Sequence, residues 1–278
     1  MAQATDKLTR RPVLSRFPRL HVRLQATTGR SLLPVLLLLL LVILWEVIVK
    51  VRGISVIILP APSVVFQRLL EEPGYFFIEN GLITLYEAVA GFALGAAVAI
   101  ALASVMVHSS LVERTAFPLA VLVKATPIVV IAPLLVIWFG YGPMPKIIMA
   151  SLICFFPILV NTIVGLRSVD ATSLEFFRSL AASKWEIFRQ LRIPHSLPYV
   201  LASFKTAASL SVIGAVVAEW AGAGRGLGRV VFIKAANLDQ AAVFAGVFVL
   251  AAMGILLTAI VGWLEKRLLY WHESVLVG

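Results

Sequence analysis

LLPVLLLLLLVILWEVIV, residues 32–49, is an almost wholly apolar run. At about 1.5 Å per residue, a helix of this length crosses the ~30 Å hydrocarbon layer of a bilayer. Its apolar core is longer than that of a typical signal peptide, and no cleavage site with small residues follows it. The run therefore predicts a retained transmembrane helix. The alternative is that this N-terminal segment is an export signal that is cleaved, because Arg10-Arg11 is similar to a twin-arginine pair.

Apolar runs of spanning length recur along most of the chain. Of its 278 residues, 60% are hydrophobic and only 14% are charged. That apolar content exceeds the ~45–50% of ordinary soluble domains. We therefore expect an all-α membrane protein with a six-helix transmembrane bundle, in which a basic tail (1–31) precedes one transmembrane domain (32–272). The six spans are expected at about residues 32–49, 82–107, 116–139, 147–166, 197–220 and 241–264.

The distribution of basic residues predicts the orientation in the membrane. The formal net charge is +10, and seven Lys and Arg lie in the first thirty residues. With both termini in the cytoplasm, the inner segments hold 15 basic residues and the outer segments hold 7. This bias obeys the positive-inside rule. The tail is expected to contact anionic lipids rather than nucleic acid, because no aromatic stacking pattern accompanies its charges.

Two spans have unusual compositions. The second is rich in small residues, including Gly91 and Gly95, which predicts close helix packing inside the bundle. The third contains Pro118, Pro127 and Pro133 and must be kinked or broken. Freed carbonyls are tolerated in lipid only beside other protein or a water-filled path. This span is therefore either a helix whose prolines only kink it or a helix that lines a water-filled path through the bundle.

The most polar internal stretch lies between the fourth and fifth spans. Residues 170–198 read DATSLEFFRSLAASKWEIFRQLRIPHSLP. Ser183 and Glu186 have the spacing of a capping box. We expect two short helices separated near residues 181–183 and stopped by Pro194. Their aromatic surface either folds back on the bundle or docks into a partner.

No G-x-x-x-x-G-K-[ST] phosphate loop occurs in the sequence, so we expect ATP to bind elsewhere. The stretch resembles the EAA motif of bacterial ABC importer permeases, an E-A-A triplet followed by a glycine and a final I-x-L-P at fixed spacing. Residues 175–177 match the triplet, Ala181 the glycine and residues 191–194 the ending. The spacing is kept, whereas Phe176, Phe177 and Ala181 depart from the motif.

Further segments look like the subgroup of nitrate, sulfonate, taurine and vitamin-precursor permeases, over roughly residues 31–272. Glu87 stands where we expect an arginine in the oxyanion members, which argues against nitrate or sulfonate. It favours a heteroaromatic vitamin or its precursor, such as riboflavin or a hydroxymethylpyrimidine. The matching segments are Thr84-Leu85 with Gly91-Phe92, 133–140, Phe155-Phe156-Pro157 with Asn161-Thr162, Ala218-Glu219, and Gly226-Leu227-Gly228.

The resemblance implies a type I ABC importer permease, a transport subunit and not an enzyme. Its implied partners are two ATP-binding subunits that hydrolyse ATP, a second permease copy in a homodimer, and a periplasmic or lipid-anchored solute-binding protein, all at the inner membrane. A coupling loop at residues 167–197 would transmit ATP-driven movement. The implied coupling residues are Glu175, Phe177, Arg178, Ala181, Ser183, Trp185, Ile193 and Pro194.

Polar groups within the spans are candidates for the solute pathway, since they are costly in lipid and usually face the bundle interior. Glu87, Asn161 and Glu219 qualify. Trp138 could stack on a flat solute or anchor the outer interface. No metal or cofactor is expected, because Cys154 is alone and the four histidines fit no ligand spacing.

Other functions remain open at this point. One is a permease subunit of an ABC importer that carries nitrate, sulfonate or taurine. A secondary transporter or channel would work without an ATPase, although no internal repeat supports it. An intramembrane enzyme lacks a cluster of His, Asp and Glu, or a Ser beside a base, within the spans.

Overall fold

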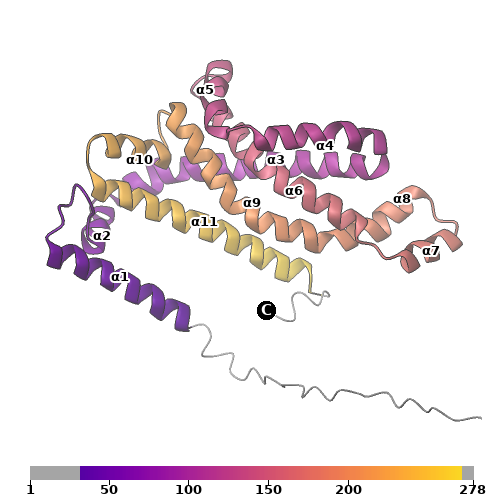
Figure 1. The fold of residues 1–278 in the computed structure, drawn as a ribbon, viewed down its shortest axis with the longest axis horizontal. Helices are drawn as coiled ribbons and strands as arrows, with labels where there is room; N and C mark the ends of the chain where they lie inside the picture. The colour runs from indigo at the N-terminus through magenta and orange to yellow at the C-terminus, as the bar shows by residue number, and fades with distance from the viewer. Residues whose placement is uncertain (1–31, 271–278) are drawn as a thin grey trace, which may run out of the picture. The chain divides into compact units, whose positions relative to one another are not determined.

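The computed structural model describes residues 32–270, and all regular structure in that range is helical (Figure 1). Five helices are long and apolar enough to cross a membrane, and a bent helix pair brings the number to as many as six. The predicted all-α membrane fold is confirmed; the tail 1–31 lies outside the described residues. The elements are α1 Leu32–Arg52, α2 Pro62–Glu71, η1 Gly74–Gly81, α3 Leu82–His108, α4 Ser110–Ala125, α5 Ile128–Phe139, α6 Met144–Arg167, α7 Ala171–Ser179, α8 Lys184–Glu186, η2 Ile187–Arg192, α9 Ile193–Gly222, α10 Leu227–Ala236 and α11 Gln240–Leu268.

The chain divides into two compact units within α1, after Leu44. In the first unit, the side chains of residues 33–44 are all exposed. An apolar helix with no protein cover suits a lipid environment, where its backbone hydrogen bonds are satisfied internally. The second unit begins at Trp45 and contains every other helix.

Three helices pack closely at the centre of the second unit. A Cβ atom built on Gly91 of α3 would lie 2.4 Å from the Cβ of Ala150 in α6. One built on Gly214 of α9 would lie 2.6 Å from the Cα of Ala150. A Cβ on Gly95 would lie 2.7 Å from the Ser151 carbonyl. The predicted close packing of the small-residue span is confirmed, since α6 contacts α3 and α9 where side chains are absent or minimal.

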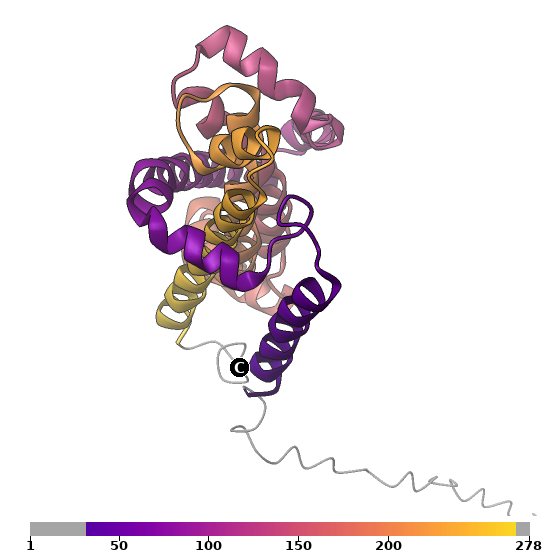
Figure 2. The ribbon, with the colours of Figure 1, turned by 90° about the vertical axis from the view of Figure 1, so that its left-hand side faces the viewer.

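The third span is broken at Pro127. Helices α4 and α5 meet there at 98°, and both views show α5 leaving the line of α4 (Figures 1 and 2). Thr126 is extended at ψ 131°, the conformation favoured before proline. The expected start of this span at about residue 116 is wrong, because α4 already begins at Ser110. The Ser109 hydroxyl caps it, accepting the Val112 N–H at 3.4 Å.

The predicted stop at Pro194 is also wrong. Residues Lys184–Gly222 form one continuous helical segment. Pro194 lies in the first turn of α9, directly after the wide helical turns of η2. In a regular α-helix the proline ring would collide with the carbonyl four residues back, and a wider turn gives it room.

Two stretches between the expected spans contain helices. Residues 50–81 include α2 and η1, and α10 lies between the expected fifth and sixth spans. The start of α2 is tied to α1 by Glu46, whose carboxylate accepts the Ser63 N–H at 2.9 Å and the Ser63 hydroxyl at 2.7 Å. Lys50 pairs with Glu46 at 2.6 Å, one turn along α1. A long-range carboxylate thus replaces the local cap that Ala61 cannot supply.

Candidate functional site

A buried polar cluster joins the end of α9 to the starts of α3 and α10, at the opposite end of the second unit from α7 and α8 (Figure 1). Glu219 is fully buried and accepts a hydrogen bond from the Thr84 hydroxyl at 2.6 Å. Its other oxygen accepts the N–H groups of Gly228 and Arg229. The first N–H groups of a helix lack partners within the helix, so the Glu219 carboxylate caps α10 from a distant part of the chain.

The turn before α10 is shaped around this carboxylate. Gly226 has φ +122°, and a Cβ built on it would lie 2.3 Å from the Glu219 carboxyl carbon. Its N–H donates to Asn80 Oδ1 at 2.9 Å, and the Leu227 N–H donates to Thr84 Oγ1 at 2.8 Å. Glycine is required here for both conformation and space.

A second buried acid lies beside the first. Glu87, one turn after Thr84 in α3, is 3% exposed and adjacent to Glu219, and its Oε2 has no hydrogen-bond partner. Lys146 of α6 is 1% exposed near both acids. Its ammonium donates to the carbonyls of Tyr141 and Gly142 at 2.8 and 2.9 Å. Charges are rarely buried without pairing, so this group of two acids and one base stands out in a membrane bundle.

A cavity of about 480 Å³ opens beside Glu87 and Lys146. This volume is in the range of small-molecule sites. Glu87 reaches it from α3, Lys146 from α6, and Arg225 from the turn before α10. Its other lining residues are Leu82, Ile83, Tyr86, Tyr141, Gly142, Pro143, Ala223 and Gly224.

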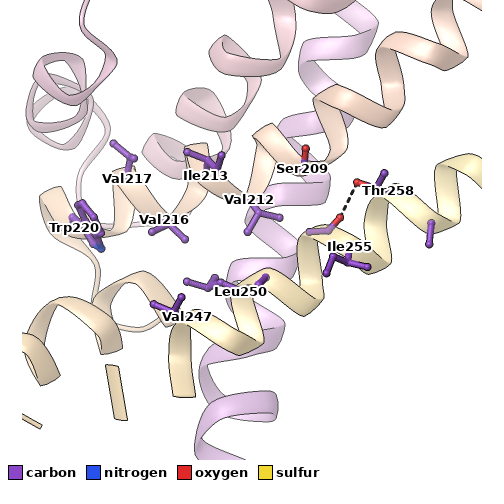
Figure 3. A pocket seen from close by; sticks show the side chains of 13 residues that line it. Ser209, Val212, Ile213, Val216, Val217, Trp220, Val247, Leu250, Ile255 and Thr258 are labelled. Atoms are coloured by element: carbon purple, nitrogen blue, oxygen red, sulfur yellow. Dashed lines mark hydrogen bonds between the residues drawn. The ribbon is translucent and has the colours of Figure 1, made fainter. Parts of the chain in front are cut away.

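An apolar groove of about 740 Å³ lies between α9 and α11 (Figure 3). Val212, Val216 and Leu250 are among the aliphatic side chains that line it. Ser209 and Thr258 are its hydroxyl-bearing residues, and the Thr258 hydroxyl is already donated to the Gly254 carbonyl at 2.8 Å. This groove offers a polar solute few partners, so we place the candidate solute site at the Glu87 cavity instead.

The predicted capping box is confirmed in the segment between α6 and α9. The Ser183 side chain accepts the Glu186 N–H at 3.2 Å, and Glu186 accepts the Ser183 N–H at 2.7 Å. Asp170 caps α7 in a similar way through the Ser173 N–H at 2.6 Å. That backbone bond, with the one from the Ser173 hydroxyl, lowers the pKa of Asp170. Both short helices therefore have fixed starting points.

Helix α7 ends in a turn that places Ala181 in the left-handed region, at φ +54°. The Ala181 N–H donates to the Arg178 carbonyl at 2.9 Å, and the Ala182 N–H donates to the Phe177 carbonyl at 3.1 Å. This pair of bonds is a Schellman motif, in which glycine is the usual residue. Glycine adopts a positive φ without strain. This explains why the EAA motif has glycine at the position that Ala181 occupies here.

The aromatic residues of this segment divide between the bundle and the surface. Phe188 is 7% exposed and packs edge-to-face on His108, with ring centroids 4.6 Å apart. Phe176, Leu180 and Trp185 are 60–63% exposed. The segment therefore folds back on the bundle through Phe188 and leaves an apolar surface. Of the predicted coupling residues, Glu175, Arg178, Ala181, Ser183, Trp185, Ile193 and Pro194 are exposed and Phe177 is partly buried.

The four predicted pathway residues do not form one site. Glu87 and Glu219 are brought together, whereas Trp138 is 68% exposed on α5 and does not line the cavity. Asn161 donates to the Pro157 carbonyl of its own helix at 2.8 Å. Sequence reasoning missed Lys146, which lies between the expected third and fourth spans, just before residue 147. Its position directly after the turn-forming residues Gly140-Tyr141-Gly142-Pro143 was the available signal.

Residues 91–270 match the family of binding-protein-dependent transport system inner membrane components. The chain belongs to this family. Its relatives include the formylaminopyrimidine transport permease of Halalkalibacterium halodurans, 35% identical over 88% of this chain and 98% of the relative. The riboflavin transport system permease of Chloroflexus aurantiacus is 33% identical over 87% and 90%. The taurine transport system permease of Escherichia coli is 30% identical over 84% and 88%.

A solved amino acid ABC transporter shares the fold with this permease. The TM-score is 0.57 at 17% identity, and the match covers 73% of this chain and 96% of that chain. The protein is therefore a multi-pass inner-membrane permease of an ABC importer for small solutes, in the nitrate, sulfonate and taurine-like subgroup. Within residues 32–270 no group of three or more His, Cys, Asp or Glu side chains could hold a metal ion.

Proposed function

We propose that this permease imports a small nitrogen heterocycle, a pyrimidine vitamin precursor or riboflavin. The observation that carries the proposal is the buried Glu87 carboxyl group at a cavity of about 480 Å³. A buried carboxyl group offers oxygen acceptors to the ring and amino N–H groups of a heterocycle, whereas an oxyanion has no N–H group to offer it. The names of two relatives, a formylaminopyrimidine and a riboflavin permease, support the same class of solute.

The α7–α8 segment is the proposed docking site of the ATP-binding subunit, with one such subunit beneath each permease. Its exposed Phe176, Leu180 and Trp185 form an apolar surface on short capped helices. Such a surface suits insertion into a groove of a partner protein. Phe188, which is packed in the bundle, would transmit the movement of the docked segment.

Membership of the family supports the remaining partners of the proposal. We propose a homodimer of permeases, served by a periplasmic or lipid-anchored solute-binding protein at the Glu219 end of the bundle. Both termini would be cytoplasmic, as the distribution of basic residues indicates. ATP hydrolysis would occur on the partner subunit, since the permease sequence carries no phosphate-loop motif.

The test is uptake into proteoliposomes that contain the permease, its ATP-binding subunit and its binding protein. Labelled 4-amino-5-hydroxymethyl-2-methylpyrimidine, riboflavin and taurine are compared with and without internal ATP. We expect ATP-dependent uptake of the pyrimidine or the flavin. Uptake of taurine alone would overturn the proposed solute. Uptake driven by an ion gradient without ATP would instead indicate a secondary transporter.

A further inference from the structure

The break between α4 and α5 leaves backbone groups without helical partners inside a membrane span. Helix α4 ends at Ala125, and Pro127 has no N–H group with which to continue it. The last carbonyls of a helix have no partner within it, and residues 121–127 are all exposed. Lipid offers these carbonyls no hydrogen bond, so irregular backbone at membrane depth occurs only beside other protein or water. Something other than residues 32–270 must therefore cover this break.

A charged side chain lies at the same place. Lys124 is exposed, and its ammonium group is 4.5 Å from the centroid of the Phe156 ring in α6. Phe156 lies twelve residues after the start of α6 at Met144 and eleven before its end at Arg167. The 24 residues of α6 extend over about 36 Å, so the ammonium group lies near the middle of the bundle and reaches neither interface.

The surroundings of Lys124 are unsuited to lipid. No ion pair within residues 32–270 includes Lys124. The Phe156 ring stabilises the charge on one side only, and an ammonium group has three N–H donors to satisfy. Cations at the centre of a bilayer are expensive and almost always face the bundle interior or a water-filled cavity. The exposed side of Lys124 therefore faces water at mid-membrane depth.

The opposite wall of such a water-filled space is supplied by a second copy of the chain. A two-fold axis places the same surface of each copy opposite the other. Two Lys124 ammonium groups across this axis repel each other, so water must separate them. The side chains beside the break are apolar, since Leu122, Val129 and Val130 are 63–65% exposed. They can pack between the copies around the wet centre.

We propose that the α4–α5 break and Lys124 line a water-filled path shared by two copies of the permease, whose ammonium groups exclude cations and admit neutral or anionic solutes. The inference rests on the proposed function, because it needs the homodimer, and it adds the route beyond the first cavity. Glu87 is five residues from the start of α3, whereas Lys124 lies at mid-depth. A solute that moves inward from the Glu87 cavity would pass Lys124 next.

The reactivity of an introduced cysteine measures both water and charge at the break. Ala125 is exposed and adjacent to Lys124; the control position, Leu256, is 55% exposed near the middle of α11. Ala125→Cys and Leu256→Cys complexes in nanodiscs are treated with a negatively and a positively charged methanethiosulfonate of similar size. Each rate is divided by the rate with a small free thiol. The natural Cys154 is buried and contributes little background.

We expect Ala125→Cys to react at least tenfold faster than Leu256→Cys and to prefer the negative reagent. Adding Lys124→Met should reduce that preference severalfold, whereas Lys124→Arg should keep it, because only the first removes the positive charge. Lys124→Gln is the second neutral variant if Lys124→Met fails to accumulate. No reaction at position 125, equal rates at the two positions, or a preference that is indifferent to Lys124 would each overturn the inference.

A distance measurement tests whether the path is shared. A spin label is attached in detergent to Ala125→Cys or to Leu256→Cys, and pulsed electron spin resonance gives the distance between the two labels of a homodimer. We expect the distance to be shorter for position 125. An equal or longer distance there would overturn the inference. A monomeric permease would give no such distance, which would refute the homodimer and the inference together.

The uptake assay separates this inference from the proposed solute. If the wild-type complex imports the aminopyrimidine with ATP while Ala125→Cys stays unreactive, the proposed solute stands and the path fails. If the complex imports only taurine, the proposed solute fails, and the cysteine measurements still decide whether the path exists.

Discussion

The hydroxyl of Thr84 donates to the carboxylate of Glu219 over 2.6 Å, joining the start of α3 to the end of α9. The two residues are 135 positions apart in the sequence. Thr84 also accepts the Leu227 N–H at 2.8 Å, so one hydroxyl links three helices. The polar end of the bundle therefore depends on a few side chains whose loss can be measured.

Thr84→Val tests this link. The change keeps the shape of the side chain but leaves the Leu227 N–H and a Glu219 oxygen unpaired in a buried place. We expect a loss of roughly 1–3 kcal/mol in the free energy of unfolding. Thermal unfolding of purified protein measures the loss. Thr115→Val is the control, because Thr115 is exposed and bonds only carbonyls of its own helix. Equal effects of the two changes would contradict the prediction.

Gly226→Ala tests the turn around Glu219. The new Cβ would lie 2.3 Å from the Glu219 carboxyl carbon, on a backbone with φ +122°. Strain of this kind costs about 1–3 kcal/mol, and the overlap adds to it. We expect little folded protein in the membrane, measured by fluorescence-detected size exclusion. Gly224→Ala should behave as the wild type, because nothing lies within 4 Å of its added Cβ. Normal accumulation of Gly226→Ala would contradict the turn described above.

Ala181→Gly should stabilise the end of α7. Ala181 has φ +54°, and glycine adopts this conformation without the roughly 1–2 kcal/mol that the Cβ costs. We expect the backbone amides of residues 181 and 182 to exchange hydrogen more slowly in this variant than in the wild type. Ala182→Gly is the control and should exchange faster, since it adds only chain freedom. A similar change in both variants would show that the left-handed turn is not the cause.

Glu175→Arg tests coupling to the ATP-binding subunit. Glu175 is exposed on α7 and lies where the EAA motif has its glutamate. We expect normal insertion and stability, with ATP-dependent uptake reduced at least tenfold while solute-independent ATP hydrolysis continues. Glu175→Gln, which removes the charge without reversing it, should have the smaller effect. Normal uptake by Glu175→Arg would remove this helix from the coupling path.

Asp170 gives α7 a defined pH response. Its pKa is lowered from the ordinary value of 3.8, first by the Ser173 N–H and then by the Ser173 hydroxyl. A lowered folded-state pKa means that the cap is present above about pH 4 and is lost as the pH falls through the lowered value. The Ser173 amide resonance should titrate below pH 3.8. Asp170→Asn should keep the cap and abolish the titration; a midpoint above 3.8 would contradict the cap geometry.

Much of the fold could be predicted because the relevant signals are local. The leucine run of α1, the small residues at Gly91 and Gly95, and the proline at 127 each act within a turn or two of helix. The capping box at Ser183 needs only four residues. These features are decided by chain geometry and by the lipid environment, and both can be read from composition and spacing.

The candidate site could be predicted only in part, because its partners come from distant segments. Glu87 and Glu219 were singled out as costly intramembrane acids, but their contact depends on how α3 and α9 pack. Lys146 is buried because the turn at Tyr141 and Gly142 offers it two carbonyls. Helix α10 was missed because the group that caps it is the carboxylate of Glu219. No local pattern contains that information.

The unbroken helical segment Lys184–Gly222 has a consequence for timing. Its 39 residues would span roughly 58 Å as a helix, from the exposed Trp185 surface to the turn beside the Glu87 cavity. If the α7–α8 segment is the docking site proposed above, a tilt of this segment moves both of its ends. Opening at one face and closing at the other would then be linked events, and a leak through both faces at once would require the segment to bend, for which the wide turns of η2 and Pro198 are the available points.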